Sequence, residues 1–225
     1  MSIPKKRKGA ILLDVGCCLG TDVRKAAVDG WPIEYIIGSD LRRGYWVLGH
    51  ELFNTVPESF PATFLEGDLL EAVETTDGKP QSDLLPAYLS EVILEGGASV
   101  IHASALFHLF NEQQQRLAAA RLLRTLSCKP GSMILGAHVG LPKIGYQDST
   151  PGSGVRAFCH DPQSWEGMWE EVWVESGLGG LGGLRLAFET ELRDTPAEDT
   201  DAVVGDDGFW FLVWSVTLVR VANRA

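Results

Sequence analysis

The sequence has no apolar run close to the roughly 20 residues that a membrane-spanning helix needs. Its basic N-terminus is followed by only five uncharged residues, 9–13, before Asp14, which is too short for the apolar core of a signal peptide. The four cysteines show no Cys-x-x-Cys spacing, so neither a zinc site nor a disulfide framework is indicated. The sequence therefore predicts a cytoplasmic protein that neither spans a membrane nor is secreted, and no metal site.

Basic residues are scarce outside the N-terminus. The chain carries 30 acidic and 19 basic residues, a net charge of −11 at pH 7, and four of the basic residues occupy positions 5–8. The rest of the chain has 15 basic against 30 acidic residues, a net charge of −15. A chain of this charge is unsuited to bind nucleic acid, because proteins bind nucleic acid through clustered Lys and Arg side chains. The run Lys5–Lys8 fits either a nuclear import signal or an ordinary solvated terminus, and the second reading is preferred.

Short apolar runs that end at turn residues alternate with segments of helical spacing. We expect a basic tail over residues 1–9 and a single domain over 10–225, since a domain averages about 150 residues. The apolar runs predict buried strands at 10–15, 34–39, 62–66, 98–103 and 132–139. Helices are predicted at 21–29, 43–53, 87–94 and from the N-cap Asn111 to Leu126, with a loop at 75–86. This alternation is typical of an α/β fold with a parallel sheet and helices on both faces.

The last third of the chain has a different pattern. Asp161 and Pro162 predict a helix start, and apolar residues then follow at i, i+3, i+4, i+7 and i+8. These residues are Trp165, Met168, Trp169, Val172 and Trp173. We interpret their face as core or as a subunit contact, which leaves a homodimer open. Strands at 184–192 and 209–221 follow without a helix between them, which predicts an antiparallel pair.

Acidic residues end three successive predicted strands. Asp14 opens the turn Asp-Val-Gly-Cys-Cys-Leu-Gly, Asp40 ends the second strand, and Asp68 follows the third. Glycines at a strand-to-helix turn let a ligand approach the backbone, and an acid after the next strand can bind both ribose hydroxyls. The set predicts a nucleoside-cofactor site at this edge of the sheet. The alternative is a tight turn that binds nothing.

The glycine spacing distinguishes between nucleoside cofactors. A nicotinamide dinucleotide favours Gly-x-Gly-x-x-Gly, but counting from Gly16 the required glycines fall on Cys18 and Thr21. An acid two residues before the first glycine instead suits a ligand that brings a positively charged amine, as S-adenosylmethionine does. A matching Gly-x-Gly-x-x-Gly at 177–182 follows a helix rather than a strand, so we interpret it as a linker.

Four stretches carry a family resemblance. They are LLDVGCCLG at 12–20, IHASALFHLF at 101–110, PGSMILG at 130–136 and the Trp-rich helix after His160. The chain resembles the class I S-adenosylmethionine-dependent methyltransferases, and more narrowly the small fungal methyltransferases of meroterpenoid and polyketide pathways. The resemblance covers residues 10 to about 175. It implies a Rossmann-like, mostly parallel sheet with a C-terminal antiparallel hairpin, and O-methylation of a carboxyl or hydroxyl group on a small hydrophobic secondary metabolite.

The resemblance also implies roles for individual residues. Asp14, Gly16 and Gly20 line the methionine end of the cofactor, Asp40 and Leu41 the ribose, and Asp68 and Leu69 the adenine. We add the neighbouring loop and strand-end residues Cys17, Cys18, Ala103 and Ser104 to the expected cofactor site.

Methyl transfer from S-adenosylmethionine needs few catalytic groups from the protein. Positioning is the main requirement, and a neutral hydroxyl acceptor also needs a base, whereas a carboxylate needs none. His108 is the candidate base or acceptor-orienting residue, with His102 nearby, and either ring can equally be structural. His138, His160 and Arg156 are candidates for the acceptor pocket, Arg156 through a bidentate contact with a carboxylate.

The chain departs from the family pattern at its start. Family members have a helical region before the first strand that helps cover the cofactor, and here nine residues precede that strand. Either the chain is truncated or the site is open. An open site raises an alternative function, namely a methyltransferase fold that acts as a cyclase, an isomerase or a binding subunit. An NAD-dependent oxidoreductase is a third hypothesis, which the missing glycines disfavour.

Overall fold

The computed structural model describes residues 7–72, 85–148, 156–180, 183–195 and 209–221. The helices are α2 (Thr21–Val28), α3 (Arg43–Leu52), α4 (Ala87–Leu94), α5 (Glu112–Thr125) and α6 (Pro162–Glu175), with the 3₁₀ turns η1 (Ile33–Tyr35), η2 (Phe107–Leu109) and η3 (Leu178–Gly180). The strands are β1 (Leu12–Val15), β2 (Ile36–Asp40), β3 (Thr63–Glu66), β4 (Val100–His102), β5 (Met133–Gly140), β6 (Gly145–Asp148), β7 (Arg156–Cys159), β8 (Leu184–Thr195) and β9 (Phe209–Arg220). Most of the loop predicted at 75–86 lies outside the described residues. Within them, no helix is both long and apolar enough to cross a membrane.

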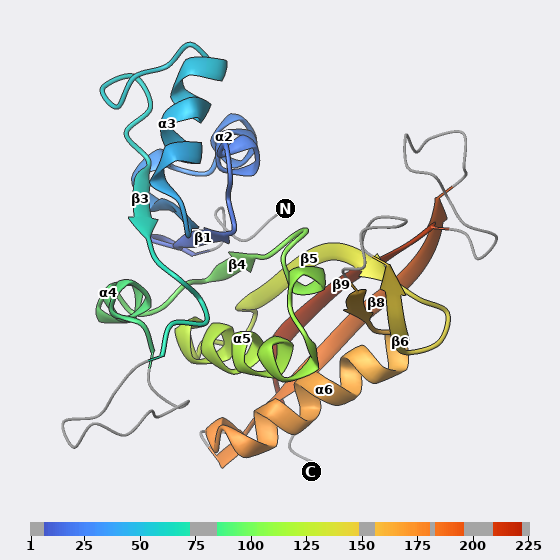
Figure 1. Cartoon of the computed structure of the whole chain (residues 1–225). Helices are drawn as coiled ribbons and strands as arrows, with labels where there is room; N and C mark the ends of the chain where they lie inside the picture. Colours follow the sequence, from blue (N-terminus) through green and yellow to red (C-terminus); the bar gives the residue numbers. More distant parts are fainter. Residues whose placement is uncertain (1–6, 73–84, 149–155, 181–182, 196–208, 222–225) are drawn as a thin grey trace.

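Seven of the strands form one sheet of order β3-β2-β1-β4-β5-β9-β8 (Figure 1). Strands β1 to β5 run parallel, and β9 lies antiparallel between β5 and β8. The predicted mostly parallel sheet with a C-terminal antiparallel pair is therefore confirmed. Because β1 lies between β2 and β4, the carboxyl ends of these strands meet at one edge, where an open α/β sheet binds its ligand.

Alternate residues of β1 pack against different helices. Leu13 and Val15 belong to the larger core cluster, together with buried residues of α4, α5 and α6. Leu12 faces the other way and packs in a second cluster with Val23 of α2 and Trp46 of α3. This two-residue period is that of a strand with both faces covered, and it confirms the prediction of helices on both faces.

The apolar face of α6 lies inside the molecule. Trp165 and Trp169 are fully buried. The ring of Trp165 packs 4.8 Å from that of Trp214 on β9 and 4.9 Å, edge to face, from that of Phe107. Such edge-to-face and tilted contacts add to the apolar area that these large rings bury. Trp165 and Trp169 of the predicted apolar stripe therefore belong to the core.

The sequence patterns missed a small second sheet. Strands β6 and β7 pair antiparallel, with Tyr146 opposite Phe158 and their rings 5.1 Å apart. Each strand has only four residues, too short for alternation of apolar and polar residues to stand out from a loop. This hairpin precedes α6 and lies away from the edge where β1, β2 and β4 end (Figure 1).

Candidate cofactor and acceptor site

A pocket of about 460 Å³ opens at the carboxyl ends of β1, β2, β3 and β4. It is lined by Val15, Gly16, Cys18, Ser39, Asp40, Leu41, Arg42, Tyr45, Gly67, Asp68, Leu69, Tyr88, Ser104, Ala105, Leu106, Leu109 and Phe110. Seven residues of the predicted cofactor site are in this lining, and the structure brings them together from four separate stretches of sequence. They are Gly16, Cys18, Asp40, Leu41, Asp68, Leu69 and Ser104.

The loop after β1 is shaped by left-handed backbone. Gly16 has φ 75° and Gly20 has φ 72°, values that a residue with a Cβ rarely adopts. A Cβ on Gly20 would also lie 2.7 Å from the ring of Trp46, so this glycine packs against α3 rather than lining the pocket. Cys18 has φ 48° and is exposed in the pocket, whereas Cys17 is buried beneath the loop, where burial raises the pKa of its thiol.

Asp40 holds the loop in place from the end of β2. Its Oδ2 accepts a hydrogen bond from the Cys18 backbone N–H at 2.9 Å, and its Oδ1 accepts one from the Arg42 N–H at 3.0 Å. A carboxylate has about four acceptor sites, so each oxygen keeps one for a ligand. Two remaining acceptor sites on one carboxylate suit the two adjacent hydroxyls of a ribose.

The far wall of the pocket follows β3. Asp68 caps its own turn, since its Oδ1 accepts a hydrogen bond from the Leu70 N–H at 2.8 Å. A Cβ on Gly67 would lie 2.1 Å from the ring of Tyr88, so the glycine lets α4 approach. Arg121 of α5 is buried and holds this wall in place. Its guanidinium donates to the carbonyl oxygens of Leu69 and Glu71 at 2.5 and 2.8 Å. No sequence signal pointed to Arg121 or Tyr88 as parts of the site.

Asp14 and Ala103 lie behind the pocket wall. Ala103 is fully buried and donates its backbone N–H to the Leu135 carbonyl oxygen. Asp14 is buried, and its Oδ1 lies 2.7 Å from the Nδ1 of His102, directly opposite it in the β1–β4 register. The His102 Nε2 in turn lies 2.8 Å from the Oγ of Ser104. Asp14 is therefore linked to the pocket through His102 and Ser104, not as a lining residue.

The charges of Asp14 and His102 act on each other. Burial would lower the pKa of His102, but its hydrogen bond to Asp14 and the charge of that carboxylate, with a further contribution from Asp22, raise the pKa above its ordinary value. Burial raises the pKa of Asp14, and the hydrogen bond and charge of His102 act against that rise. The second oxygen of Asp14, Oδ2, is buried without a hydrogen-bond partner among the described residues.

His108 lies beside the pocket on η2. Its neighbours Leu106 and Leu109 line the pocket, while its own ring is partly buried and is not in the lining. Its Nδ1 is buried without a hydrogen-bond partner in the described part of the chain, and burial lowers the pKa of the ring. A neutral ring of this kind can accept a proton, so the assignment of His108 as a base stays a prediction.

His138 and His160 lie in the aromatic core. His138 is buried, its Nδ1 accepts a hydrogen bond from the Trp214 indole N–H at 3.0 Å, and burial lowers its pKa to about 3. His160 is also buried, with its Nδ1 3.0 Å from the Ser164 Oγ and a pKa lowered by burial to about 4. Both rings contact Trp165. The structure brings these two histidines together, away from the pocket lining.

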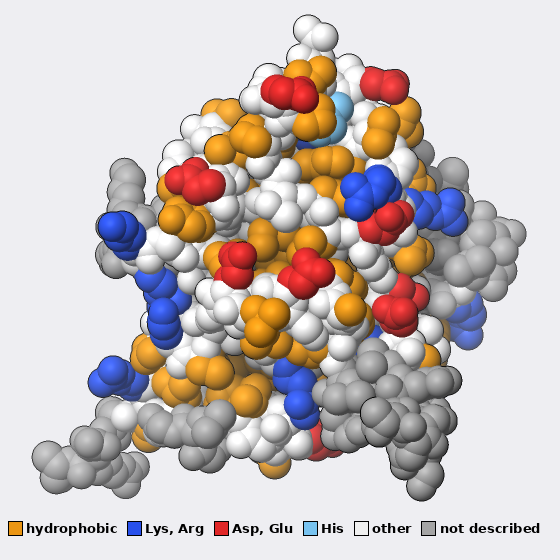
Figure 2. Space-filling model, turned by 90° about the vertical axis from the view of Figure 1, so that its left-hand side faces the viewer, with side chains coloured by type: hydrophobic (Ala, Val, Ile, Leu, Met, Phe, Trp, Pro, Cys, Tyr) orange, Lys and Arg blue, Asp and Glu red, His pale blue; other side chains and the backbone are white. Residues whose placement is uncertain are grey.

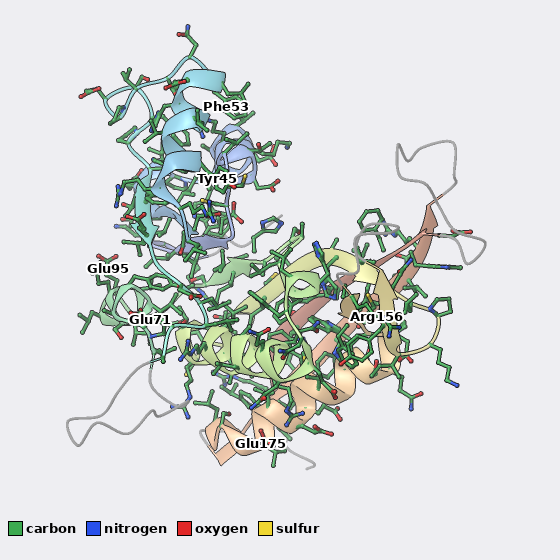
Figure 3. The ribbon with its side chains drawn as sticks, in the orientation of Figure 1. Tyr45, Phe53, Glu71, Glu95, Arg156 and Glu175 are labelled. Atoms are coloured by element: carbon green, nitrogen blue, oxygen red, sulfur yellow. The ribbon has the colours of Figure 1, made fainter. Side chains whose placement is uncertain are left out.

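Arg156 lies on the small hairpin. It is exposed, its guanidinium lies 5.3 Å from the centre of the Tyr146 ring, and it donates to the Tyr146 carbonyl oxygen at 3.3 Å. Figure 3 shows it well separated from Tyr45, which lines the pocket from α3. The structure does not bring Arg156 to the pocket.

The rim of the pocket is apolar. Leu41, Tyr45 and Leu109 all line the pocket and are 40 to 66% exposed. Leu48 and Leu52 continue the exposed face along α3, at spacings of three and seven residues from Tyr45. Figure 2 shows hydrophobic side chains gathered among acidic ones on the side of the molecule that carries α3. A hydrophobic molecule can enter the pocket across this rim.

The chain matches no family model. Among curated proteins, the chain is 34% identical over 165 residues to a fungal O-methyltransferase (Fungal sp.). This alignment covers 73% of this chain and 50% of the relative. It is also 34% identical over 196 residues to the Asnovolin E/Chermesin D methyltransferase of Aspergillus novofumigatus, covering 80% of this chain and 65% of the relative. The chain thus spans about half to two thirds of the length of these relatives.

Solved structures of methyltransferases have the same architecture. The magnesium protoporphyrin IX methyltransferase of Synechocystis aligns with 93% of this chain and 70% of its own, with a TM-score of 0.51 and 12% identity. The methyltransferase domain of bacterial CtHen1 aligns with 96% of this chain and 94% of its own, with a TM-score of 0.53 and 11% identity. The chain has the class I methyltransferase fold. Its similarity to fungal pathway methyltransferases, expected from the sequence motifs, is confirmed.

Proposed function

We propose that this chain is an S-adenosylmethionine-dependent O-methyltransferase that acts on a small hydrophobic secondary metabolite. The observation that carries the proposal is the pocket at the strand ends, in which the Asp40 carboxylate keeps two acceptor sites beside a left-handed glycine loop. Similarity to proteins named O-methyltransferases supports the reaction class. Relatives named as methyltransferases also favour methyl transfer over the cyclase, isomerase or binding-subunit alternative.

The lining residues fit an adenosyl cofactor. Asp40 offers its remaining acceptor sites to ribose hydroxyls, and the apolar side chains of Leu69 and Leu106 with the ring of Tyr88 offer surfaces for a flat base. Gly16 keeps the loop backbone close to the pocket. When bound, S-adenosylmethionine would supply an already reactive methyl group. The protein's task is then to orient the acceptor and to manage its proton.

Other features of the proposal concern partners. A body with a net charge of −15 beyond the basic run supports a small-molecule acceptor over nucleic acid. We also propose a cytoplasmic location, and a homodimer for which the exposed apolar side chains on α3 offer a surface.

Binding of S-adenosylhomocysteine tests the proposal directly. Ligand at about 100 times its dissociation constant should stabilise the native state by roughly 2.7 kcal/mol, a rise in thermal midpoint of about 5 to 11 °C for a chain of this size. NAD should give no rise. Asp40→Asn should weaken S-adenosylhomocysteine binding at least tenfold, because it removes one acceptor oxygen, while Glu95→Gln on the exposed end of α4 serves as the matched control. A folded protein that NAD stabilises and S-adenosylhomocysteine does not would overturn the proposal.

A further inference from the structure

We propose that Ser104 binds the ammonium group at the methionine end of the cofactor, and that Asp14 and His102 act through Ser104 as positioning residues. The acid ahead of the glycine loop then takes part in binding without touching the ligand. The inference rests on the proposed function, because it concerns how this pocket would hold S-adenosylmethionine. It is carried by a continuous chain of hydrogen bonds from the pocket wall to a buried carboxylate.

The strand order places Ser104 at one end of the pocket. Along this edge the sheet runs β3-β2-β1-β4, with Asp68 after β3, Asp40 at the end of β2 and Ser104 after β4. An adenosyl ligand with its base at Asp68 and its ribose at Asp40 therefore has its amino-acid part on the β1–β4 side. Gly16 follows β1, between these positions in the strand order, and has no side chain to fill the pocket there.

The direction of the hydrogen bonds follows from counting donors. An ionised carboxylate only accepts, so the His102 Nδ1 carries a proton and donates to the Asp14 Oδ1 at 2.7 Å. The Nε2 of the neutral ring then accepts, and the Ser104 O–H donates to it from 2.8 Å. The Ala137 backbone N–H uses one acceptor site of the Ser104 Oγ, at 3.2 Å. One acceptor site remains, and a hydroxyl that can only accept suits an ammonium group rather than a carboxylate.

The backbone of β5 holds Ser104 in a fixed orientation. Besides the hydrogen bond from the Ala137 N–H to the Ser104 Oγ, the Ala137 carbonyl oxygen accepts one from the Ala105 N–H at 2.7 Å. Ala105 has φ 50°, which is uncommon for a residue with a Cβ and persists only where the surrounding structure holds it. Ser104 therefore presents its remaining acceptor site in one direction, which reduces the entropy lost when a ligand binds.

Asp14 supplies negative charge from behind the pocket wall. Its side chain is buried, and its Oδ2 has no hydrogen-bond partner among the described residues. Water screens a buried charge less than an exposed one, so the field of this carboxylate reaches further. Asp22 adds a second carboxylate, and one oxygen of each acid and one ring nitrogen of His102 lie within 4.8 Å of one another. Both charges favour a cation at Ser104.

Protonation of His102 reverses what Ser104 offers to the pocket. A protonated ring donates from Nε2 to the Ser104 Oγ, which fills its second acceptor site and turns the Ser104 O–H towards the ligand. Ser104 then suits a carboxylate rather than an ammonium group. The charged side chains that line the groove beside the ring are Asp14, Asp22, Lys25 and Asp29, the last two joined in an ion pair. The two acids without a lysine partner raise the pKa of His102.

A first experiment compares two analogues of S-adenosylhomocysteine by calorimetric titration. The decarboxylated analogue keeps the amine, and the deaminated analogue keeps the carboxylate. Above the His102 pKa, Ser104→Ala should weaken binding of S-adenosylhomocysteine and of the decarboxylated analogue about 10- to 100-fold, as loss of a hydrogen bond to a charged group does. Binding of the deaminated analogue should not change. Ser90→Ala, whose hydroxyl donates to the Pro86 carbonyl oxygen at the start of α4, is the matched control.

A second experiment measures the positioning role of His102 and Asp14 through pH. As pH falls through the His102 pKa, followed by NMR of the ring nitrogens, affinity for the decarboxylated analogue should fall and affinity for the deaminated analogue should rise. His102→Gln should abolish both changes, because an amide does not titrate in this range. Asp14→Asn should move both to lower pH, because the carboxylate that raises the His102 pKa is lost. His50→Gln, in the last turn of α3, is the matched control.

The outcomes separate this inference from the proposed function. If Ser104→Ala binds S-adenosylhomocysteine as tightly as the wild type, the cofactor site stands and the inference is wrong. If Ser104→Ala weakens all three ligands by the same factor, Ser104 has only a structural role, which also overturns the inference. The pH experiment on the unsubstituted chain needs no variant to fold, and affinities for the two analogues that change in parallel would contradict the inference. A folded wild type that does not bind S-adenosylhomocysteine overturns both proposals.

Discussion

His102 and His138 lie on neighbouring strands of one sheet and have opposite electrostatic surroundings. His102, at the end of β4, pairs with a carboxylate, and its pKa is raised despite burial. His138, on β5, accepts a hydrogen bond from an indole and is surrounded by aromatic rings, so burial lowers its pKa to about 3. Burial alone therefore predicts a neutral, structural histidine, and a charged partner is what makes a buried histidine available for proton transfer.

The two regions also differ in what holds them together. The aromatic core around His138 is packed from large rings, including those of Phe107, Trp165 and Trp214, with centres 4.6 to 6.0 Å apart. The strand-end edge around His102 is held by hydrogen bonds between single side chains and loop backbone, with Asp40 and Asp68 accepting and Arg121 donating. We expect substitutions in the first region to change stability, and those in the second to change ligand binding more than stability.

Trp165→Ala should have the largest effect on stability. The side chain is fully buried, and its removal leaves a cavity among rings, with a cost of about 3 to 5 kcal/mol. Urea unfolding measures this cost, and Val174→Ala at an exposed position of the same helix is the control. A Trp165→Ala protein that loses less than about 1 kcal/mol would show that the aromatic core is loosely packed.

Arg121→Met tests the strand-end edge. It keeps much of the apolar stem but removes the two charge-assisted hydrogen bonds to the Leu69 and Glu71 carbonyl oxygens. The loss should destabilise the fold by about 2 to 3 kcal/mol and should weaken S-adenosylhomocysteine binding, since Leu69 lines the pocket. Calorimetric titration of the folded variant measures the affinity. An unchanged dissociation constant would mean that the far wall of the pocket does not depend on Arg121.

His138→Gln sharpens the comparison through pH. A histidine with a folded pKa of about 3 and an unfolded value of about 6.5 gives stability that is complete above pH 6.5 and is lost as pH falls towards 3. Between pH 7 and 5 the wild type should therefore lose about 2 kcal/mol more than His138→Gln, which cannot titrate but keeps an acceptor for the Trp214 N–H. Urea unfolding at both pH values measures the difference. Equal losses in the two proteins would show that the His138 ring is protonated in the native state.

Much of the fold was predictable because local signals mark the ends of its elements. Helix α4 begins and ends at the predicted residues, and Asn111 and Asp161 form the N-caps that their side chains suggested. The glycine loop and Asp40 were predictable for the same reason, since the strand-to-helix turn fixes where they lie. Short strands without alternation, such as β6 and β7, carry no such local signal.

The hydrogen bonds that join Asp14 and His102 could not be predicted, because the two residues meet only through the sheet order. Asp14 and His102 are 88 residues apart in sequence and become neighbours because β4, rather than β3, pairs with β1. Because side chains alternate between the two faces of a strand, each residue's position along the strand decides which face it lies on. His138 therefore lies in the core, although its strand β5 runs parallel to β4, which carries His102. Arg121 was missed because nothing in a helical sequence shows that a guanidinium crosses to a distant loop.

Arg116→Ala should have the smallest effect and sets the baseline for Arg121→Met on the same helix. Arg116 pairs with Glu171 and Glu175 of α6, but these carboxylates are about two thirds exposed. Exposed ion pairs contribute roughly 0 to 1 kcal/mol, because solvent screens them and both side chains lose freedom. Urea unfolding at low and high salt should show a small difference that shrinks further with salt. A cost above about 2 kcal/mol would mean that this pair, not only the aromatic core, holds α6 against α5.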